Sequence, residues 1–173
     1  WQQVRVATAL ASGQTEAMLK DSAHMKLASL PPAVTLLGLA GWLPQALCIW
    51  AVLDKGAYQW TARAAGCFYV ALILSFLGGL WWMAGLLGGV RKSGLYVVSV
   101  LPSLAAWAAL LPWSEGWHWP GPSLVALGLL LLASPLVDHK LAGEVILPEG
   151  WLRLRVWMAS GLGVLTLVLA AVG

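Results

Sequence analysis

The sequence predicts an all-α protein, a polytopic membrane helix bundle of about five transmembrane helices with a cytoplasmic N-terminus. The first observation is composition: 60% of the 173 residues are hydrophobic and 10% are charged. A soluble domain is about 45–50% apolar and about 25% charged, so a soluble enzyme and a disordered chain are both excluded. The second is a series of five apolar runs, each near the roughly 20 residues that span a bilayer. The third is the presence of twelve tryptophans, a residue type that favours membrane–water interfaces.

The apolar runs give the elements in order: 31–53, 64–89, 94–113, 120–137 and 152–172. They are rich in Leu, Ala and Gly and lack the period-2 alternation of a barrel strand, so each is predicted to be a helix. Four or six helices remain alternatives because the fourth run is short.

Proline positions predict features of two of these runs. Pro31 and Pro32 suit a helix start, where a missing N–H has little effect. Pro44 predicts a kink in the first run and Pro102 a kink in the third.

Two segments differ in polarity. Residues 1–30 are polar and lack the apolar stretch of a secretory signal, so they are interpreted as an interfacial helix or as an extension before a start at Met25. Residues 31–173 form the predicted transmembrane bundle.

The basic residues give the orientation. One side of the membrane receives eight of them and the other side receives only Lys55 and Arg63. By the positive-inside rule the eight lie in the cytoplasm, or in the matrix of an organelle. The net charge of +3 is therefore read as a topology signal, and no nucleic-acid partner is predicted. The eight are Arg5, Lys20, Lys26, Arg91, Lys92, Lys140, Arg153 and Arg155.

No run carries an ionisable residue near its centre. Such residues mark proton relays and ion paths inside membranes, so the pattern argues against a pump, an ion-coupled transporter or an intramembrane acid–base enzyme. No catalytic residue is predicted. The central polar residues are expected to bond within or between helices; they are Gln45, Ser75, Ser103, Ser134, Ser160 and Thr166.

Small residues recur along the second run at helical spacing, so they lie near one face. Small residues let another helix approach closely in lipid. The face is expected to pack against another helix of the same chain. The functional alternatives are a docking groove for a partner protein and a slot for a flat apolar ligand. The face comprises Ser75, Gly78, Gly79, Trp82, Gly85 and Gly89.

Basic residues also gather at the cytoplasmic ends of the runs, where they orient the protein in the membrane and can bind anionic lipid headgroups. These candidates are Arg91, Lys92, Lys140, Arg153 and Arg155. Asp138 ends the fourth run and Arg155 begins the fifth, so an ion pair across the connector 138–151 is expected.

No metal site is predicted, because no His, Cys, Asp and Glu cluster has ligand spacing. His118 and His139 fall on opposite sides of the membrane. Cys48 and Cys67 fall at similar depth, and two free thiols are favoured over a disulfide. No cofactor is predicted, while a bound lipid, quinone or pigment stays open because such ligands need no motif.

Several signposts resemble a family. They are LGLAG at 37–41 followed by Pro44, SFLGG at 75–79 after Tyr69, LPSLAAW at 101–107, Asp138, and LP at 147–148 with LRLR at 152–155. In this order and spacing the chain resembles the small multi-pass proteins related to transmembrane protein 69, a domain of unknown function in bacteria and mitochondria. That family usually follows SFLGG with His or Arg and then Trp-Gly, where Trp81, Trp82 and Met83 stand here. The resemblance implies five helices in the bacterial inner membrane or its mitochondrial counterpart, and no established activity.

Two functions follow as hypotheses. The first is a non-catalytic accessory subunit or assembly factor of a larger inner-membrane complex, whose partners are membrane lipids and other integral membrane subunits. The alternative is a small-molecule or lipid binder, carrier or lipid-modifying enzyme. Its pocket would lie between the second, third and fifth helices, lined by Trp82 and Ser103, with Arg91, Arg153 or Arg155 holding an anionic head.

Overall fold

The computed structural model describes residues 30–117 and 120–172, and this part of the chain contains helices and no strands. The helices are α2 (Pro32–Ala40), α3 (Leu43–Leu53), α4 (Gln59–Leu87), α5 (Ser93–Ser114), α6 (Gly121–Ala142) and α7 (Trp151–Val172). Taking α2 and α3 as one span, the described residues hold five helices long and apolar enough to cross a membrane. The predicted fold class is confirmed, and the chain is an integral membrane protein. The expectation for residues 1–29 lies outside the described residues.

Two helices extend beyond their apolar runs. Helix α4 begins at Gln59 instead of residue 64, and α6 continues to Ala142 instead of ending at residue 137. The extension of α6 carries Leu141 into the core, where it is 2% exposed. The prediction that the α6–α7 connector begins at Asp138 was therefore wrong, because a helix can continue past the apolar stretch when its inner face still packs.

The kink expected at Pro44 is a break in the first span. Helix α2 ends at Ala40, residues 41–42 form a turn, and Pro44 lies in the first turn of α3. Proline is tolerated there because the first turn has no intrahelical acceptor for its N–H. The Tyr69 hydroxyl on α4 donates a hydrogen bond of 2.6 Å to the Gly41 carbonyl, which ties the break to the bundle. By contrast, α5 continues as one helix through Pro102.

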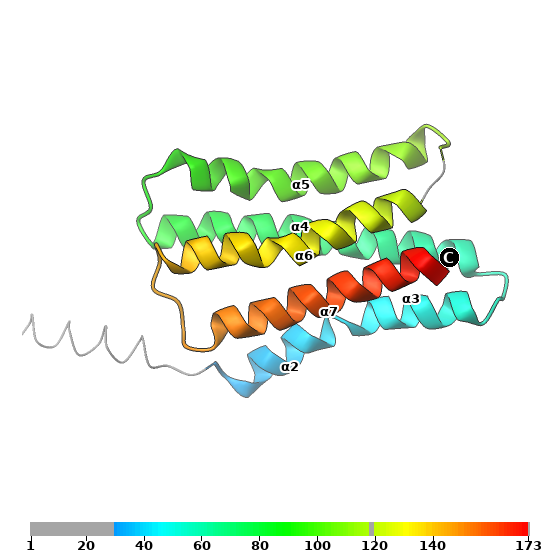
Figure 1. Cartoon of the computed structure of the whole chain (residues 1–173), viewed down its shortest axis with the longest axis horizontal. Coiled ribbons are helices and arrows are strands. Elements are labelled where there is room, and N and C mark those ends of the chain that lie inside the picture. The colour runs from blue at the N-terminus through cyan, green and yellow to red at the C-terminus, as the bar shows by residue number, and fades with distance from the viewer. Residues whose placement is uncertain (1–29, 118–119, 173) are drawn as a thin grey trace, which may run out of the picture.

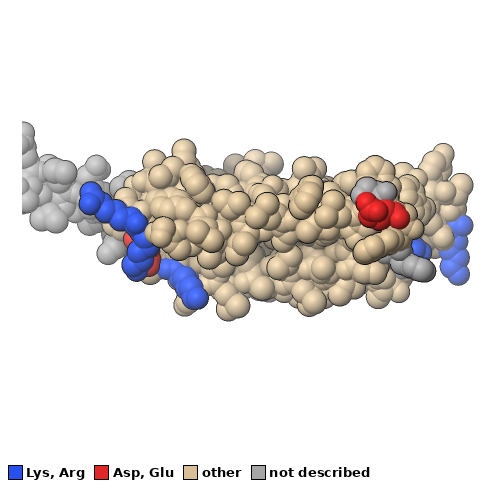
Figure 2. Space-filling view, turned by 90° about the horizontal axis from the view of Figure 1, so that it is seen from above, with Lys and Arg blue, Asp and Glu red and all other residues tan. Residues whose placement is uncertain are grey.

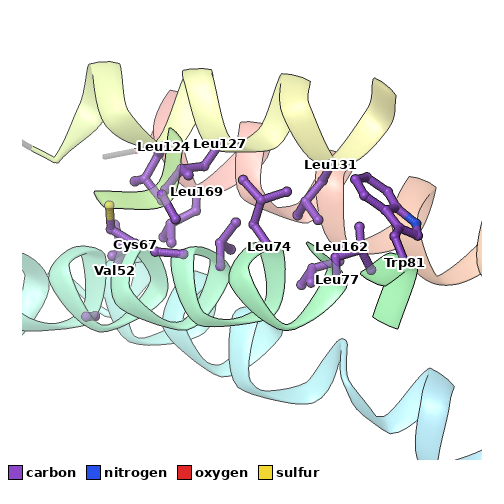
Figure 3. Close-up of a cluster of buried hydrophobic side chains, with 14 of the residues drawn as sticks. Val52, Cys67, Leu74, Leu77, Trp81, Leu124, Leu127, Leu131, Leu162 and Leu169 are labelled. Atoms are coloured by element: carbon purple, nitrogen blue, oxygen red, sulfur yellow. The ribbon is translucent and has the colours of Figure 1, made fainter. Parts of the chain in front are cut away.

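The spans form three layers (Figure 1). Helix α5 lies on one side, α4 and α6 lie in the middle, and α7 lies on the other side together with α2 and α3. The core fills the space between α4, α6 and α7, where leucines interdigitate along the length of the bundle (Figure 3). Its largest buried members include Leu74, Leu124, Leu127, Leu131, Leu141 and Leu169.

The two ends of the bundle differ in charge. The α4–α5 and α6–α7 connections and the start of α2 lie at one end (Figure 1), which carries Arg91, Lys92, Lys140 and Arg153. We call it the basic end. Lys55 and Arg63 lie at the opposite end, near the α3–α4 connection. Figure 2 shows Lys and Arg at the two ends of the molecule and a broad band without charged residues between them, as a membrane-spanning protein requires.

Candidate functional site

A buried ion pair joins α6 to α7 near the basic end. Asp138 is 0% exposed and Arg155 is 7% exposed. The Nη2 atom of Arg155 lies 3.2 Å from Oδ2 of Asp138, and Nε donates to the same oxygen at 3.2 Å. The structure thus places together the two residues for which the sequence predicts an ion pair.

A third helix joins this pair through Trp81 of α4, which is 3% exposed. Its indole Nε1 donates a hydrogen bond of 2.7 Å to Oδ1 of Asp138. Both carboxylate oxygens therefore accept hydrogen bonds, and the side chain is held in one orientation. The guanidinium carbon of Arg155 also lies 5.6 Å from the ring centroid of Trp151, within range of a cation–π interaction. We call Trp81, Asp138 and Arg155 the buried triad.

Helical spacing explains why these charges are buried. On α6, Leu131, Ser134, Asp138 and Leu141 recur every three or four residues, and all four are buried. On α7, Arg155 begins a buried face that continues through Ala159, Leu162, Thr166 and Leu169. Residues at this spacing share one side of a helix, so both charged side chains are directed toward the neighbouring helix.

The sequence places Trp81 and Trp82 together beside the expected ligand slot, but only Trp82 is predicted for the small-residue face and the pocket lining, and no polar partner is predicted for Trp81. The two residues face about 100° apart on a helix. Trp82 is 42% exposed and its ring contacts Tyr96 edge-on, with centroids 5.1 Å apart. The signal that could have separated them was the buried face of α4, because Trp81 follows Leu74 and Leu77 at helical spacing.

A second polar contact ties α3 to α7 deeper in the bundle. Gln45 and Thr166 are both 0% exposed, and Nε2 of Gln45 donates to Oγ1 of Thr166 at 3.2 Å. The Thr166 hydroxyl donates in turn to the Leu162 carbonyl at 2.7 Å. Gly66 of α4 allows this approach, since a Cβ there would meet the Leu169 side chain and the Gln45 amide.

The predicted small-residue face of α4 divides into two parts. Gly78 and Gly85 are buried against α5, where an added Cβ would meet the Ser99 carbonyl oxygen and the Leu95 side chain respectively. Ser75 joins this interface by a hydrogen bond of 2.9 Å to Ser103. Gly79 faces outward, and nothing lies within 4 Å of where its Cβ would stand.

Gly89 does not belong to this face. Helix α4 ends at Leu87, and Gly89 follows with φ +66°, a left-handed conformation that glycine adopts without strain. The prediction that Gly89 lies on the small-residue face was therefore wrong, because the helix ends before Gly89.

The predicted headgroup cluster also divides. Arg155 is committed to Asp138 inside the bundle, so its assignment to a headgroup site was wrong. Lys92 forms an exposed ion pair of 2.6 Å with Glu144. Arg91, Lys140 and Arg153 are exposed at the basic end and remain available to a headgroup.

Among the described residues, no group of three or more His, Cys, Asp or Glu side chains could hold a metal ion. Cys48 and Cys67 have free thiols. His118 lies outside the part of the chain that the structure describes.

Comparison with protein families matches residues 30–172 to one family, described as Protein of unknown function (DUF3429). The chain belongs to this family. Comparison with the curated proteins and with the solved structures found no match. The family match covers every described helix of this DUF3429 protein, and the buried triad and the Gln45–Thr166 contact both fall within it.

The pocket expected between the second, third and fifth spans is not formed in this DUF3429 protein. Helices α5 and α7 lie on opposite sides of the middle layer (Figure 1), so they cannot line one pocket together. Ser103 is hydrogen-bonded to Ser75. Trp82 faces the outside of the bundle, where its ring contacts Tyr96. That expectation was wrong because hydropathy does not tell which helices are neighbours.

Other hollows lie around the bundle. A cavity of about 50 Å³ beside Arg155 is lined by Tyr69 and Ser134 among others, which is room enough for a water molecule. An open groove of about 430 Å³ runs between α2 and the start of α7. A hollow of about 670 Å³ lies under the α6–α7 connection.

Proposed function

We propose that this chain is a non-catalytic accessory subunit or assembly factor of a larger membrane complex. The main observation behind this proposal is a gap on the outer surface of α4 at Gly79, which we call the notch. Its neighbours one turn away, Phe76 and Met83, are 63% and 54% exposed, while open space lies where a Cβ of Gly79 would stand. A small residue between bulky exposed ones lets a helix of another chain approach closely in lipid.

The pairing of buried polar groups with one another inside the bundle supports this proposal. The charges of the buried triad pair with each other, and Gln45 pairs with Thr166. These contacts fix the mutual positions of α3, α4, α6 and α7. Such a chain offers a partner a preformed surface, which suits an accessory or assembly role.

The proposed membrane is the bacterial inner membrane or its mitochondrial counterpart, on the basis of the resemblance to proteins related to transmembrane protein 69. The basic end would face the cytoplasm or the matrix, because it carries Arg91, Lys92, Lys140 and Arg153 against Lys55 and Arg63 at the opposite end.

The experiment is purification of the full chain from its native membrane in mild detergent, followed by a native gel and mass spectrometry of every co-migrating component. Gly79→Leu fills the notch, and Ala108→Leu at an exposed position on α5 is the matched control. We expect the wild type and the control to migrate with a stoichiometric partner and Gly79→Leu to migrate without it. A wild-type chain that migrates alone would overturn the proposal.

A second candidate, lipid binding at the basic end, is favoured by a different observation. The groove between α2 and α7 is open, is lined partly by apolar residues and includes Arg153. A lipid-binding function would therefore use this groove instead of the pocket expected from the sequence.

A further inference from the structure

The groove between α2 and α7 begins at the basic end and continues toward the apolar part of the bundle. Figure 1 shows α2 beside the first turns of α7, with both helices running in the same direction. The groove has a volume of about 430 Å³. At its charged end it is lined by Glu149, Gly150 and Arg153, and further along by Leu39, Trp42, Leu154 and Trp157.

Two opposite charges stand on the wall of this groove. Arg153 lies in the first turn of α7 and Glu149 lies just before the helix, and both are exposed. Among residues 30–117 and 120–172, Arg153 and Glu149 are thus a cation and an anion on the groove wall that pair neither with each other nor with a third residue.

Two tryptophans make the apolar wall. Trp42 is fixed, because its indole N–H donates to the Met158 carbonyl at 3.2 Å. Trp157 is 60% exposed and lies one helical turn beyond Arg153. Tryptophan is enriched at the depth where headgroups meet acyl chains, so the groove places its charges at headgroup level and its rings where a chain begins.

We propose that this groove binds a phospholipid with a zwitterionic, primary-ammonium headgroup. Arg153 binds the phosphate, Glu149 accepts hydrogen bonds from the ammonium group, and the first part of an acyl chain lies along Leu39, Trp42 and Trp157. A site built only to hold an anionic lipid would gain nothing from the carboxylate of Glu149, which would repel that headgroup. A quaternary ammonium group lacks the N–H donors that a carboxylate can accept.

The test is native mass spectrometry of the full chain after exchange into micelles that contain equal amounts of phosphatidylethanolamine, phosphatidylglycerol and phosphatidylcholine. We expect the wild type to retain one phosphatidylethanolamine in preference to the other two. Arg153→Gln should lower retention roughly fivefold, the effect of one basic contact near a membrane surface. Glu149→Gln should reverse the preference in favour of phosphatidylglycerol.

Lys55→Gln is the matched control, because Lys55 is an exposed basic residue at the opposite end of the bundle and does not line the groove. It should leave both retention and preference unchanged. All three substituted side chains are exposed, so the fold tolerates their replacement.

Three results would overturn the proposal. One is a wild-type chain that keeps no lipid, as would be found if residues 1–29 filled the groove. Another is wild-type retention of phosphatidylglycerol or phosphatidylcholine equal to that of phosphatidylethanolamine. The third is a loss of lipid retention in Lys55→Gln as large as that in Arg153→Gln, which would indicate only a general attraction of lipid to the positive charge of the protein.

Discussion

Three spans, α4, α6 and α7, enclose the core, and we call them the central spans or the central group. The other two spans, α5 and α2–α3, pack against this group. The two sets differ little in hydropathy but differ in how they are held. Mean hydropathy is 2.0 for α4, 1.6 for α6 and 1.8 for each of the others. The share of each span's most apolar window that is buried is 39%, 39% and 33% for α4, α6 and α7, against 17% for α5 and 11% for α2–α3. Hydropathy reports that a segment lies in a membrane, whereas burial depends on polar and small residues at particular positions.

The buried triad is the clearest feature of the central group. It joins α4, α6 and α7 through charges and an indole N–H. The α4–α5 interface instead uses small residues, with Gly78 and Gly85 against α5 and one hydroxyl pair, Ser75 with Ser103. We infer that the packing of the central group is stabilised mainly by the pairing of its buried charges. The packing of α5 against α4 is stabilised mainly by the close contact that small residues allow.

The largest expected effect is at Asp138. Asp138→Asn keeps the shape of the side chain but leaves the Arg155 charge unpaired inside the bundle, which should lower the free energy of unfolding by about 3–5 kcal/mol. The measurement is unfolding by SDS titrated into mild detergent micelles, followed by tryptophan fluorescence. His139→Gln, at the exposed neighbouring position, should change stability by less than about 0.5 kcal/mol. Equal effects at the two positions would contradict the account.

The next effect tests how α5 is held. Gly78→Ala places a Cβ against the Ser99 backbone carbonyl, so α5 must move away, and the expected loss in the same unfolding assay is about 1–3 kcal/mol. The matched control is Gly79→Ala, whose Cβ meets nothing within 4 Å. The control should be neutral or slightly stabilising, because alanine favours a helix over glycine by about 1 kcal/mol. If both variants were equally stable, the close approach of α4 and α5 would be refuted.

A smaller effect is expected at the Gln45–Thr166 contact. Thr166→Val removes the acceptor of the Gln45 amide at nearly constant volume. Hydrogen bonds between membrane helices contribute about 0.6 kcal/mol on average and up to about 1.7 kcal/mol, and a loss in this range is expected. Thr61→Val, at an exposed position near the start of α4, serves as control. A Thr166→Val chain more stable than the wild type would show that the contact does not stabilise the bundle.

The smallest effect is at the exposed pair of Lys92 and Glu144. Lys92→Gln should lower the free energy of unfolding by less than about 1 kcal/mol, because the pair is solvent-exposed. The difference from the wild type should shrink further at high salt, where surface charges are screened. A loss as large as that of Asp138→Asn would erase the distinction between the two ion pairs.

Much of the fold could be predicted from the sequence because membranes impose simple rules. Run length and apolar composition predict five spans, and proline chemistry predicts the interruption at Pro44. The helix ends could not be placed from hydropathy, since α6 continues through the polar residues 138–140 in order to pack Leu141.

The candidate sites were predicted less completely. Sequence proximity across a short connector suggests the Asp138–Arg155 pair, but the third member, Trp81, is 57 residues away from Asp138 and depends on which helices are neighbours. The groove at Arg153 depends on α2 lying beside α7, two segments more than 100 residues apart along the chain. The pattern of residues along one helix does not indicate which other helix lies beside it.

The measurement that tests the central claim most directly is a double-mutant cycle on the buried pair. It compares Asp138→Leu, Arg155→Met and the double variant in the same unfolding assay. Either single change leaves one charge buried and unpaired, whereas the double change removes both charges. We expect each single variant to lose about 3–5 kcal/mol and the double variant to lose much less than the sum of the two losses. A double variant whose loss equals that sum would contradict the claim that a paired charge holds the central spans together.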